Sequence, residues 1–178
     1  MSPQILHKTD KGLVSLNIQT EKQVVEEFRR LKDIIEKTPG ATFEGVLVQE
    51  MLKGDFTEMF VGAKRDPIFG QMVIVGLGGI YIEVLKDISM RKAPVSVQEA
   101  EEMILELKAS QILQAYRGKK ASDIAELSQV ISRFSEVIAS LDEDISEADL
   151  NPIMVFSEGQ GVKIADGLMT FNKQFAKI

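Results

Sequence analysis

The clearest hydrophobic pattern lies in residues 20–37, where apolar side chains recur at helical spacing and charged side chains fill the other positions. This pattern predicts an amphipathic helix. Thr20 is a suitable N-cap, and the Thr38-Pro39-Gly40 sequence predicts the end of the helix. Similar periodicity predicts two further helices, one over residues 96–108 that opens with the capping-box sequence Ser96-Val97-Gln98-Glu99, and a longer one over residues 122–141.

Shorter apolar runs bounded by turn residues predict strands. These runs are residues 13–18, 43–52, 57–65, 71–77, 80–82, 149–156 and 162–169, whereas residues 88–94 are expected to form a turn. Strands 43–52 and 57–65 are expected to form a pair around Gly54-Asp55, and the last two strands to form a hairpin. The arrangement predicts an α+β domain with a largely antiparallel sheet and packed helices.

Three glycines, Gly76, Gly78 and Gly79, stand between the apolar runs 72–75 and 80–82. Glycines in such positions can adopt positive φ and allow a backbone or a ligand to come close. From these residues alone, a hairpin that needs its glycines for the turn is the favoured explanation.

Composition narrows the function classes. The chain has 178 residues, of which 44% are apolar and 27% charged, as in ordinary globular proteins. Its net charge of −6 argues against nucleic acid or an anionic membrane as the main partner. The absence of cysteine excludes disulfides and thiolate chemistry. There is no signal-peptide core and no run of membrane-spanning length, so a cytoplasmic protein is expected.

The string RDPIFGQMVIVGLGGIYIEVLKD, residues 65–87, closely resembles the ATP-grasp domain of NDP-forming acyl-CoA synthetases, which include the beta subunit or domain of ADP-forming acetate–CoA ligase. The resemblance covers residues 2–169. It implies an ATP-grasp fold that binds ATP or ADP with Mg²⁺ and transfers phosphoryl between the nucleotide and a histidine relay. The chain would then be the nucleotide-binding part of an ADP-forming acyl-CoA synthetase.

His7 is the only histidine of the chain. A lone histidine beside a turn is usually a surface residue. The segment SPQILHKTDKGLV, however, resembles the family's loop I-x-H-K-[ST]-D-x-G-G-V, with Lys11 and Leu13 departing from that pattern. The resemblance implies that His7 is catalytic and relays the phosphoryl group.

The resemblance also implies a nucleotide site. It places Gln49, Glu50, Met51 and Leu52 at the hinge beside the adenine. The sequence TEMFVGAKRD is similar to a strand of succinyl-CoA synthetase beta chains and sets Glu58 at their nucleotide-contacting glutamate. Without the family, Glu58 is simply an outward residue on an alternating strand.

A metal site is expected at the terminal hairpin. Pro152 biases Asn151 toward an extended conformation, and counting outward from the turn at Glu158-Gly159-Gln160-Gly161 brings Asn151 opposite Asp166. From the residues alone, Asn151 and Asp166 could each simply shape a turn. The segments ADLNPIMV and IADGLMTFN resemble those that supply the metal-binding asparagine and aspartate of succinyl-CoA synthetase beta chains, which implies a Mg²⁺ site. Glu83 is a further candidate for the same cleft.

The family comparison suggests an incomplete domain. A complete ATP-grasp unit clamps ATP between two subdomains, and only six residues precede His7. We therefore expect an N-terminally truncated domain, in which residues 1–42 are the remainder of the first subdomain and residues 43–178 form the nucleotide- and metal-binding subdomain.

The expected partners are the missing N-terminal ATP-grasp segment and a CoA-binding alpha subunit or domain, in a hetero-oligomer. The chain alone is expected to be inactive as an acid–CoA ligase. The alternatives are an inactive regulatory or binding module associated with an acetyltransferase, and a non-functional remnant. Retention of Glu58, Asn151 and Asp166 favours the enzyme component.

Overall fold

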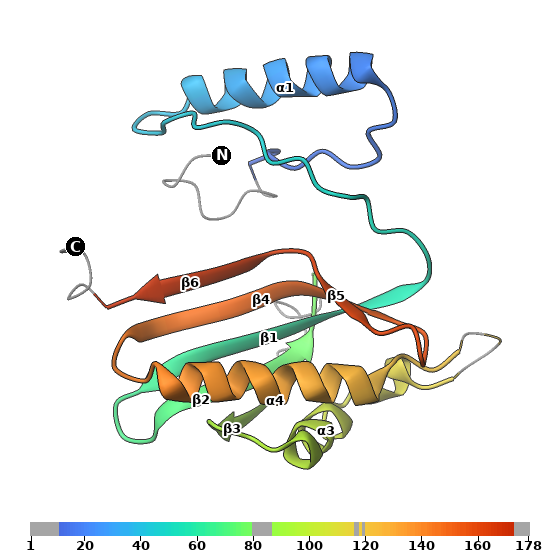
Figure 1. Ribbon diagram of the computed structural model, residues 1–178, viewed down its shortest axis with the longest axis vertical. Helices are drawn as coiled ribbons and strands as arrows, with labels where there is room; N and C mark the ends of the chain where they lie inside the picture. The colour runs from blue at the N-terminus through green and yellow to red at the C-terminus, as the bar shows by residue number, and fades with distance from the viewer. Residues whose placement is uncertain (1–10, 80–86, 116–117, 119, 173–178) are drawn as a thin grey trace. The chain divides into compact units, whose positions relative to one another are not determined.

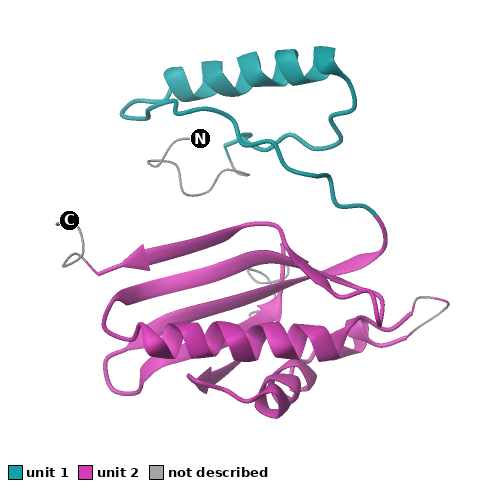
Figure 2. Cartoon of the chain, viewed as in Figure 1, with its two compact units in different colours: residues 1–53 teal, residues 54–178 magenta. Residues whose placement is uncertain are grey.

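The computed structural model describes residues 11–79, 87–115, 118 and 120–172, so that His7, Glu83 and the run 80–82 lie outside the described residues. The chain divides into two compact units, residues 1–53 (unit 1) and 54–178 (unit 2), shown in Figure 2. The sequence placed the division between residues 42 and 43. That subdomain boundary remains a prediction. The two compact units divide after Lys53, and residues 43–52 form no strand in the sheet of unit 2.

Unit 1 is built on helix α1, Glu21–Glu36, as the periodicity predicts. Its start is fixed by a capping box, in which the Thr20 Oγ1 accepts from the Gln23 amide at 3.3 Å and the Gln23 Oε1 accepts from the Thr20 amide at 3.1 Å. Leu31 and Ile35 are the buried residues of this helix. The Arg30 guanidinium donates to the Gly12 carbonyl at 2.8 Å and holds the preceding segment against α1.

The two strands predicted in unit 1 are wrong: within the described residues, neither 13–18 nor 43–52 forms a strand. A strand exists only where a neighbour satisfies its backbone N–H and C=O groups. In the described part of the chain these two segments pair with no other strand, so apolar alternation alone does not make them strands.

Unit 2 is an antiparallel sheet with helices packed on it (Figure 1), which confirms the predicted α+β class. The strand order is β3-β2-β1-β4-β5, and β6 also pairs with β4. The strands are β1 Phe56–Asp66, β2 Gly70–Leu77, β3 Ile88–Lys92, β4 Ile145–Phe156, β5 Val162–Ile164 and β6 Gly167–Phe171. The structure has strand β3 where the sequence predicted a turn over residues 88–94. In β3, Ile88 and Met90 alternate with polar residues, and the strand pairs with β2.

The remaining predicted helices are present with adjusted ends. Helix α3, Val97–Leu105, has the predicted capping box at Ser96 but ends before Lys108. Helix α4, Ile124–Ser140, begins two residues later than predicted and is capped by the Asp123 carboxylate. Between them lies a short 3₁₀ turn, η1, Ser110–Leu113. Across the described residues, no helix is both long enough and apolar enough to span a membrane.

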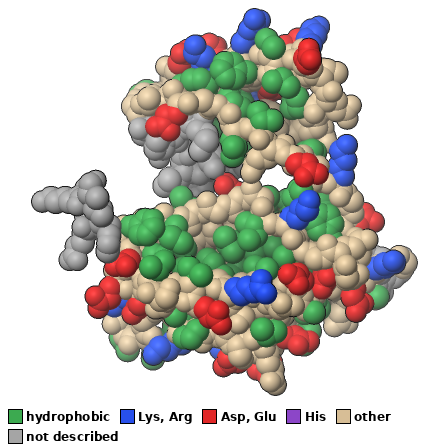
Figure 3. All heavy atoms as spheres, in the orientation of Figure 1, with side chains coloured by type: hydrophobic (Ala, Val, Ile, Leu, Met, Phe, Trp, Pro, Cys, Tyr) green, Lys and Arg blue, Asp and Glu red, His purple; other side chains and the backbone are tan. Residues whose placement is uncertain are grey.

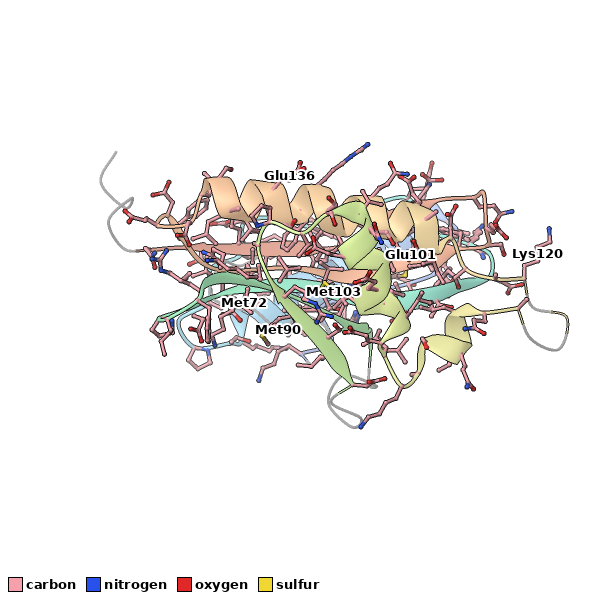
Figure 4. The ribbon with its side chains drawn as sticks, turned by 90° about the horizontal axis from the view of Figure 1, so that it is seen from below. Met72, Met90, Glu101, Met103, Lys120 and Glu136 are labelled. Atoms are coloured by element: carbon pink, nitrogen blue, oxygen red, sulfur yellow. The ribbon has the colours of Figure 1, made fainter. Side chains whose placement is uncertain are left out.

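The two faces of the unit 2 sheet differ. One face packs against α3 and α4 and forms a core of buried side chains that includes Met59, Val61, Val75, Met103, Ile131 and Ile153. The residues that alternate with these point to the opposite side, which we call the second face: Glu58, Phe60, Met72, Ile74, Met90 and Met154. Figure 4 shows Met72 and Met90 on the side of the sheet away from α4 and Glu136 on the outer side of α4.

The β1–β2 turn is fixed by one carboxylate. The Asp66 Oδ1 accepts from the Ile68 amide at 2.8 Å and from the Phe69 amide at 2.9 Å. Gly70 completes the turn with φ +78°, a conformation that favours glycine.

At the surface visible in Figure 3, acidic and basic side chains are interspersed, so the net charge of −6 is not gathered there into one acidic patch.

Candidate functional site

The terminal hairpin brings Asn151 opposite Asp166, as the sequence predicts. Strand β4 pairs with β5 and with β6 in one continuous register, with Ile153 opposite Ile164 and Leu150 opposite Gly167. The Asn151 amide donates to the Asp166 carbonyl oxygen at 3.0 Å. The predicted strand 162–169 is, however, divided into β5 and β6, and Asp166 stands immediately before β6.

A β-bulge directs Asn151 to the second face. Met59 of β1 pairs with Ile153 of β4, but Val61 pairs with Leu150, so Asn151 and Pro152 together stand opposite Phe60. Leu150 packs on the core, so strand alternation turns Asn151 away from the helices. Asp166, opposite it in the antiparallel register, shares that face. Bulges are frequent beside functional sites because they re-aim a side chain in this way.

Glu58 lies on the same face. It stands on β1 between Thr57 and Met59, which are both buried, and its own side chain is exposed. Its partner across the ladder is Met154, three residues beyond Asn151 on β4. The structure therefore brings Glu58, Asn151 and Asp166 onto one face of one sheet, although they come from distant parts of the sequence.

The glycines of β1 and β2 let neighbouring groups lie close over the second face. A Cβ built on Gly62 would stand 2.5 Å from the Phe60 ring, and one on Gly76 would stand 3.0 Å from the Asp87 carbonyl oxygen. A side chain at Gly62 would displace the Phe60 ring, and one at Gly76 would require the Asp87 backbone or the Ile88 side chain to shift. The expected close approach of a backbone is thus confirmed at Gly76, where the approaching strand is β3.

The hairpin is anchored by Asp123, a residue that the sequence pattern did not single out. Asp123 is 8% exposed, and its Oδ2 accepts from the amides of Gly159 and Gly161, each at 2.9 Å. Its Oδ1 accepts from the Glu126 amide at 3.2 Å and caps α4. One carboxylate thus ties the turn between β4 and β5 to the start of a helix. An aspartate ahead of a helical pattern signals the cap, but nothing in the sequence signals the contact with the turn.

The proposed adenine hinge belongs to a different unit. Gln49 and Glu50 are exposed and Met51 and Leu52 are half-buried, all in the non-strand segment that ends unit 1. Glu58, Asn151 and Asp166 belong to unit 2. The candidate catalytic His7 lies outside the described residues, as does Glu83.

Oxygen atoms are the metal ligands that this site offers. Among the described residues, no group of three or more His, Cys, Asp or Glu side chains is placed to hold a metal ion by itself. Asn151 and Asp166 contribute an amide and a carboxylate, and the Asp166 Oδ1 accepts from the Gly167 amide at 3.0 Å. Two such oxygen donors suit Mg²⁺, which usually keeps several waters and takes its remaining ligands from phosphates.

Known proteins similar to this chain share the ATP-grasp domain, and several are named as CoA ligases. Residues 1–171 match the family model of the ATP-grasp domain. The chain is 42% identical over 166 residues to an ADP-forming 4-hydroxybutyrate–CoA ligase of Nitrosopumilus maritimus, covering 93% of this chain and 24% of that protein. It is 38% identical over 167 residues to subunit beta of the ADP-forming acetate–CoA ligase II of Pyrococcus furiosus, covering 93% of this chain and 70% of that subunit.

A solved structure with the same fold contains ligands. It is the dinucleotide-forming acetyl-coenzyme A synthetase 1 of Candidatus Korarchaeum cryptofilum in complex with coenzyme A and Mg-AMPPCP. It matches with a TM-score of 0.80 and 35% identity, covering 97% of this chain and 74% of that one. The chain thus spans about a quarter of the length of the Nitrosopumilus relative and over two thirds of the Pyrococcus subunit.

Proposed function

Because this chain belongs to the ATP-grasp domain family, we propose that it is the nucleotide-binding part of an ADP-forming acyl-CoA synthetase. Such an enzyme interconverts acyl-CoA, ADP and phosphate with the acid, CoA and ATP. The observation that carries the proposal is that Glu58, Asn151 and Asp166 all lie on the second face. A bulge in β4 turns Asn151 to this face, which it shares with Asp166. Polar side chains brought onto one sheet face from distant parts of the chain offer the oxygen atoms that a nucleotide and its metal ion need.

In this proposal, the Asn151 and Asp166 side-chain oxygens hold Mg²⁺ together with phosphate oxygens and water. The ion, when bound, neutralises charge on the phosphates. Glu58 contacts the nucleotide from β1, and the segment from Gln49 to Leu52 supplies the hinge beside the adenine. The Korarchaeum relative was solved with Mg-AMPPCP, which supports both a nucleotide and a divalent ion for a domain of this fold.

We also infer that the chain works with further polypeptide. The Pyrococcus relative is named as a subunit beta, which supports a partner alpha subunit or domain that binds CoA. This chain covers 70% of that subunit, and we infer a further ATP-grasp segment that completes the nucleotide clamp. His7 would relay phosphoryl between the nucleotide and this partner, since a neutral imidazole is a competent nucleophile.

The alternatives have less support. A regulatory module associated with an acetyltransferase, or a remnant without ligand, needs no polar residues gathered on one sheet face. The relatives described above are named as CoA ligases and synthetases, which favours the enzyme component.

A direct test is a calorimetric titration of the whole chain with ADP in the presence of Mg²⁺. The proposal expects saturable binding at one site per chain, competed by AMPPCP. A chain that shows no saturable ADP binding under these conditions would contradict the proposed function.

A further inference from the structure

We propose that Gly78 and Gly79 are positioning residues for Glu58: they leave the space in which its side chain is held against the end of β2. This inference rests on the proposed nucleotide-binding role of Glu58. It concerns how this chain directs that carboxylate.

The backbone places Gly78 directly opposite Glu58. Residues Met59 and Leu77 are the last pair of the β1–β2 ladder, and the next pair in the same register is Glu58 with Gly78. The pairing continues there, because the Gly78 amide donates to the Glu58 carbonyl oxygen at 2.8 Å. Residues opposite each other in an antiparallel ladder share a face, so a side chain at Gly78 would stand beside that of Glu58.

A side chain at that position would require Glu58 to shift. A Cβ built on Gly78 would lie 3.0 Å from the Glu58 carbonyl carbon and 3.1 Å from both its Cβ and its carbonyl oxygen. Opposed Cβ atoms in a regular ladder are about 4.5–5.5 Å apart. The two strands therefore approach more closely here than a side chain at Gly78 permits.

The next glycine meets the carboxylate itself. A Cβ built on Gly79 would lie 3.3 Å from the Glu58 Oε2, and Gly79 has φ +64°, a conformation that a residue with a side chain rarely adopts. The Glu58 side chain thus lies over both glycines, with its backbone held by Gly78 and its carboxylate beside Gly79. The carboxylate therefore stands beside Gly79 on the second face.

The neighbouring glycine provides a matched control. Gly76 lies on the same strand and face, and a Cβ there would be equally crowded, at 3.0 Å from the Asp87 carbonyl oxygen and 3.2 Å from the Ile88 Cγ2. The crowding at Gly76 involves β3 and not Glu58. Gly76→Ala should therefore disturb the sheet to a similar extent while leaving the carboxylate in place.

The test compares the full-length wild type with G78A, G76A, E58A and the double variant E58A/G78A, using the dissociation constant for Mg·ADP. We expect E58A and G78A each to weaken binding about tenfold, the loss typical of a hydrogen bond to a charged group. The double variant should be no weaker than E58A, because Gly78 acts through Glu58, and G76A should bind within about twofold of wild type.

A second readout separates this inference from the proposed function. Crystal structures of wild type and G78A should show the Glu58 carboxylate displaced in the variant. If E58A weakens binding but G78A behaves like G76A, the positioning role is wrong while the nucleotide role stands. If neither the wild type nor any variant binds Mg·ADP, the proposed function is wrong. If the Glu58 carboxylate does not move in the G78A structure, the positioning role is wrong, whatever the binding results.

Discussion

The backbone amide of Asn151 donates a hydrogen bond to the carbonyl oxygen of Asp166 at 3.0 Å, at the junction where β5 gives way to β6. This bond keeps the two residues in register across the hairpin. Together with the bulge opposite Phe60, it turns an amide and a carboxylate to the same face of the sheet. The proposed magnesium site follows from this local geometry.

The first prediction concerns that pair. N151A and D166A should each weaken Mg·ADP binding about tenfold, because each removes one oxygen ligand of the ion, and should leave Mg²⁺-free ADP binding nearly unchanged. E158Q is the matched control, since Glu158 lies on the same hairpin, outside the register pair. Titrations with and without Mg²⁺ check this. Equal losses in both conditions would show that the pair does not bind the ion.

The second prediction concerns the anchor of the hairpin. D123A should lower the free energy of unfolding by about 2–4 kcal/mol, because it removes the cap of α4 and leaves two turn amides without their acceptor. S96A, at the exposed cap of α3, should cost only about 1 kcal/mol. Urea denaturation of both variants measures the difference. Comparable losses would mean that the turn contacts of Asp123 do not stabilise unit 2.

The third prediction is a loss of stability in acid. Hydrogen bonds from Arg91 and then from Ser89 hold the pKa of Glu106 below its ordinary 4.5, and the Phe69 and Ile68 amides lower the pKa of Asp66 from its ordinary 3.8. Because these pKa values are lower in the folded state, the stabilisation is present above the ordinary values and is lost as the pH falls through the lowered ones.

Urea denaturation between pH 7 and pH 3 tests this dependence. E106Q should be less stable than wild type at pH 7 and should lose less stability on acidification, since it has no Glu106 carboxylate to protonate. E101Q, exposed on the same helix, is the control. A wild-type stability that is flat down to pH 3 would contradict the prediction.

The fourth prediction concerns activity. The purified chain alone should not form acetyl-CoA from acetate, CoA and ATP, because phosphoryl transfer requires groups from both sides of the nucleotide. Once a CoA-binding partner and a complementing ATP-grasp segment restore turnover, H7A should abolish it while leaving nucleotide affinity nearly intact. A coupled assay of acetyl-CoA formation checks both. Turnover by the chain alone, or full activity of H7A, would contradict this account of the chain.

The helices and the terminal hairpin were predictable because their signals are local. Thr20 and Ser96 each form a capping box with a residue three positions later, which marks the start of the helix. The glycine-rich turn at 158–161 sets the register that pairs Asn151 with Asp166. The family resemblance, now supported by the match over residues 1–171, identified the fold.

The errors arose where structure depends on distant partners. Residues 13–18 and 43–52 alternate like strands but pair with no strand in the described part of the chain, whereas Ile88–Lys92 becomes β3 because β2 offers it an edge. The contact of Gly78 with Glu58 also joins residues distant in the sequence, so it could not be predicted. The glycines were recognisable as positions of close approach, but the sequence does not state which residue approaches.

Replacing Mg²⁺ by Mn²⁺ tests whether a nucleotide-metal site lies on the second face of the sheet. When Mn·ADP is added to the isotope-labelled chain, the paramagnetic ion should broaden the amide signals of Asn151 and Asp166 most strongly and that of Glu58 next. Glu136, on the outer side of α4, should be unaffected (Figure 4). Broadening that requires no nucleotide, or that is centred on α4, would contradict a nucleotide-metal site on the second face of the sheet.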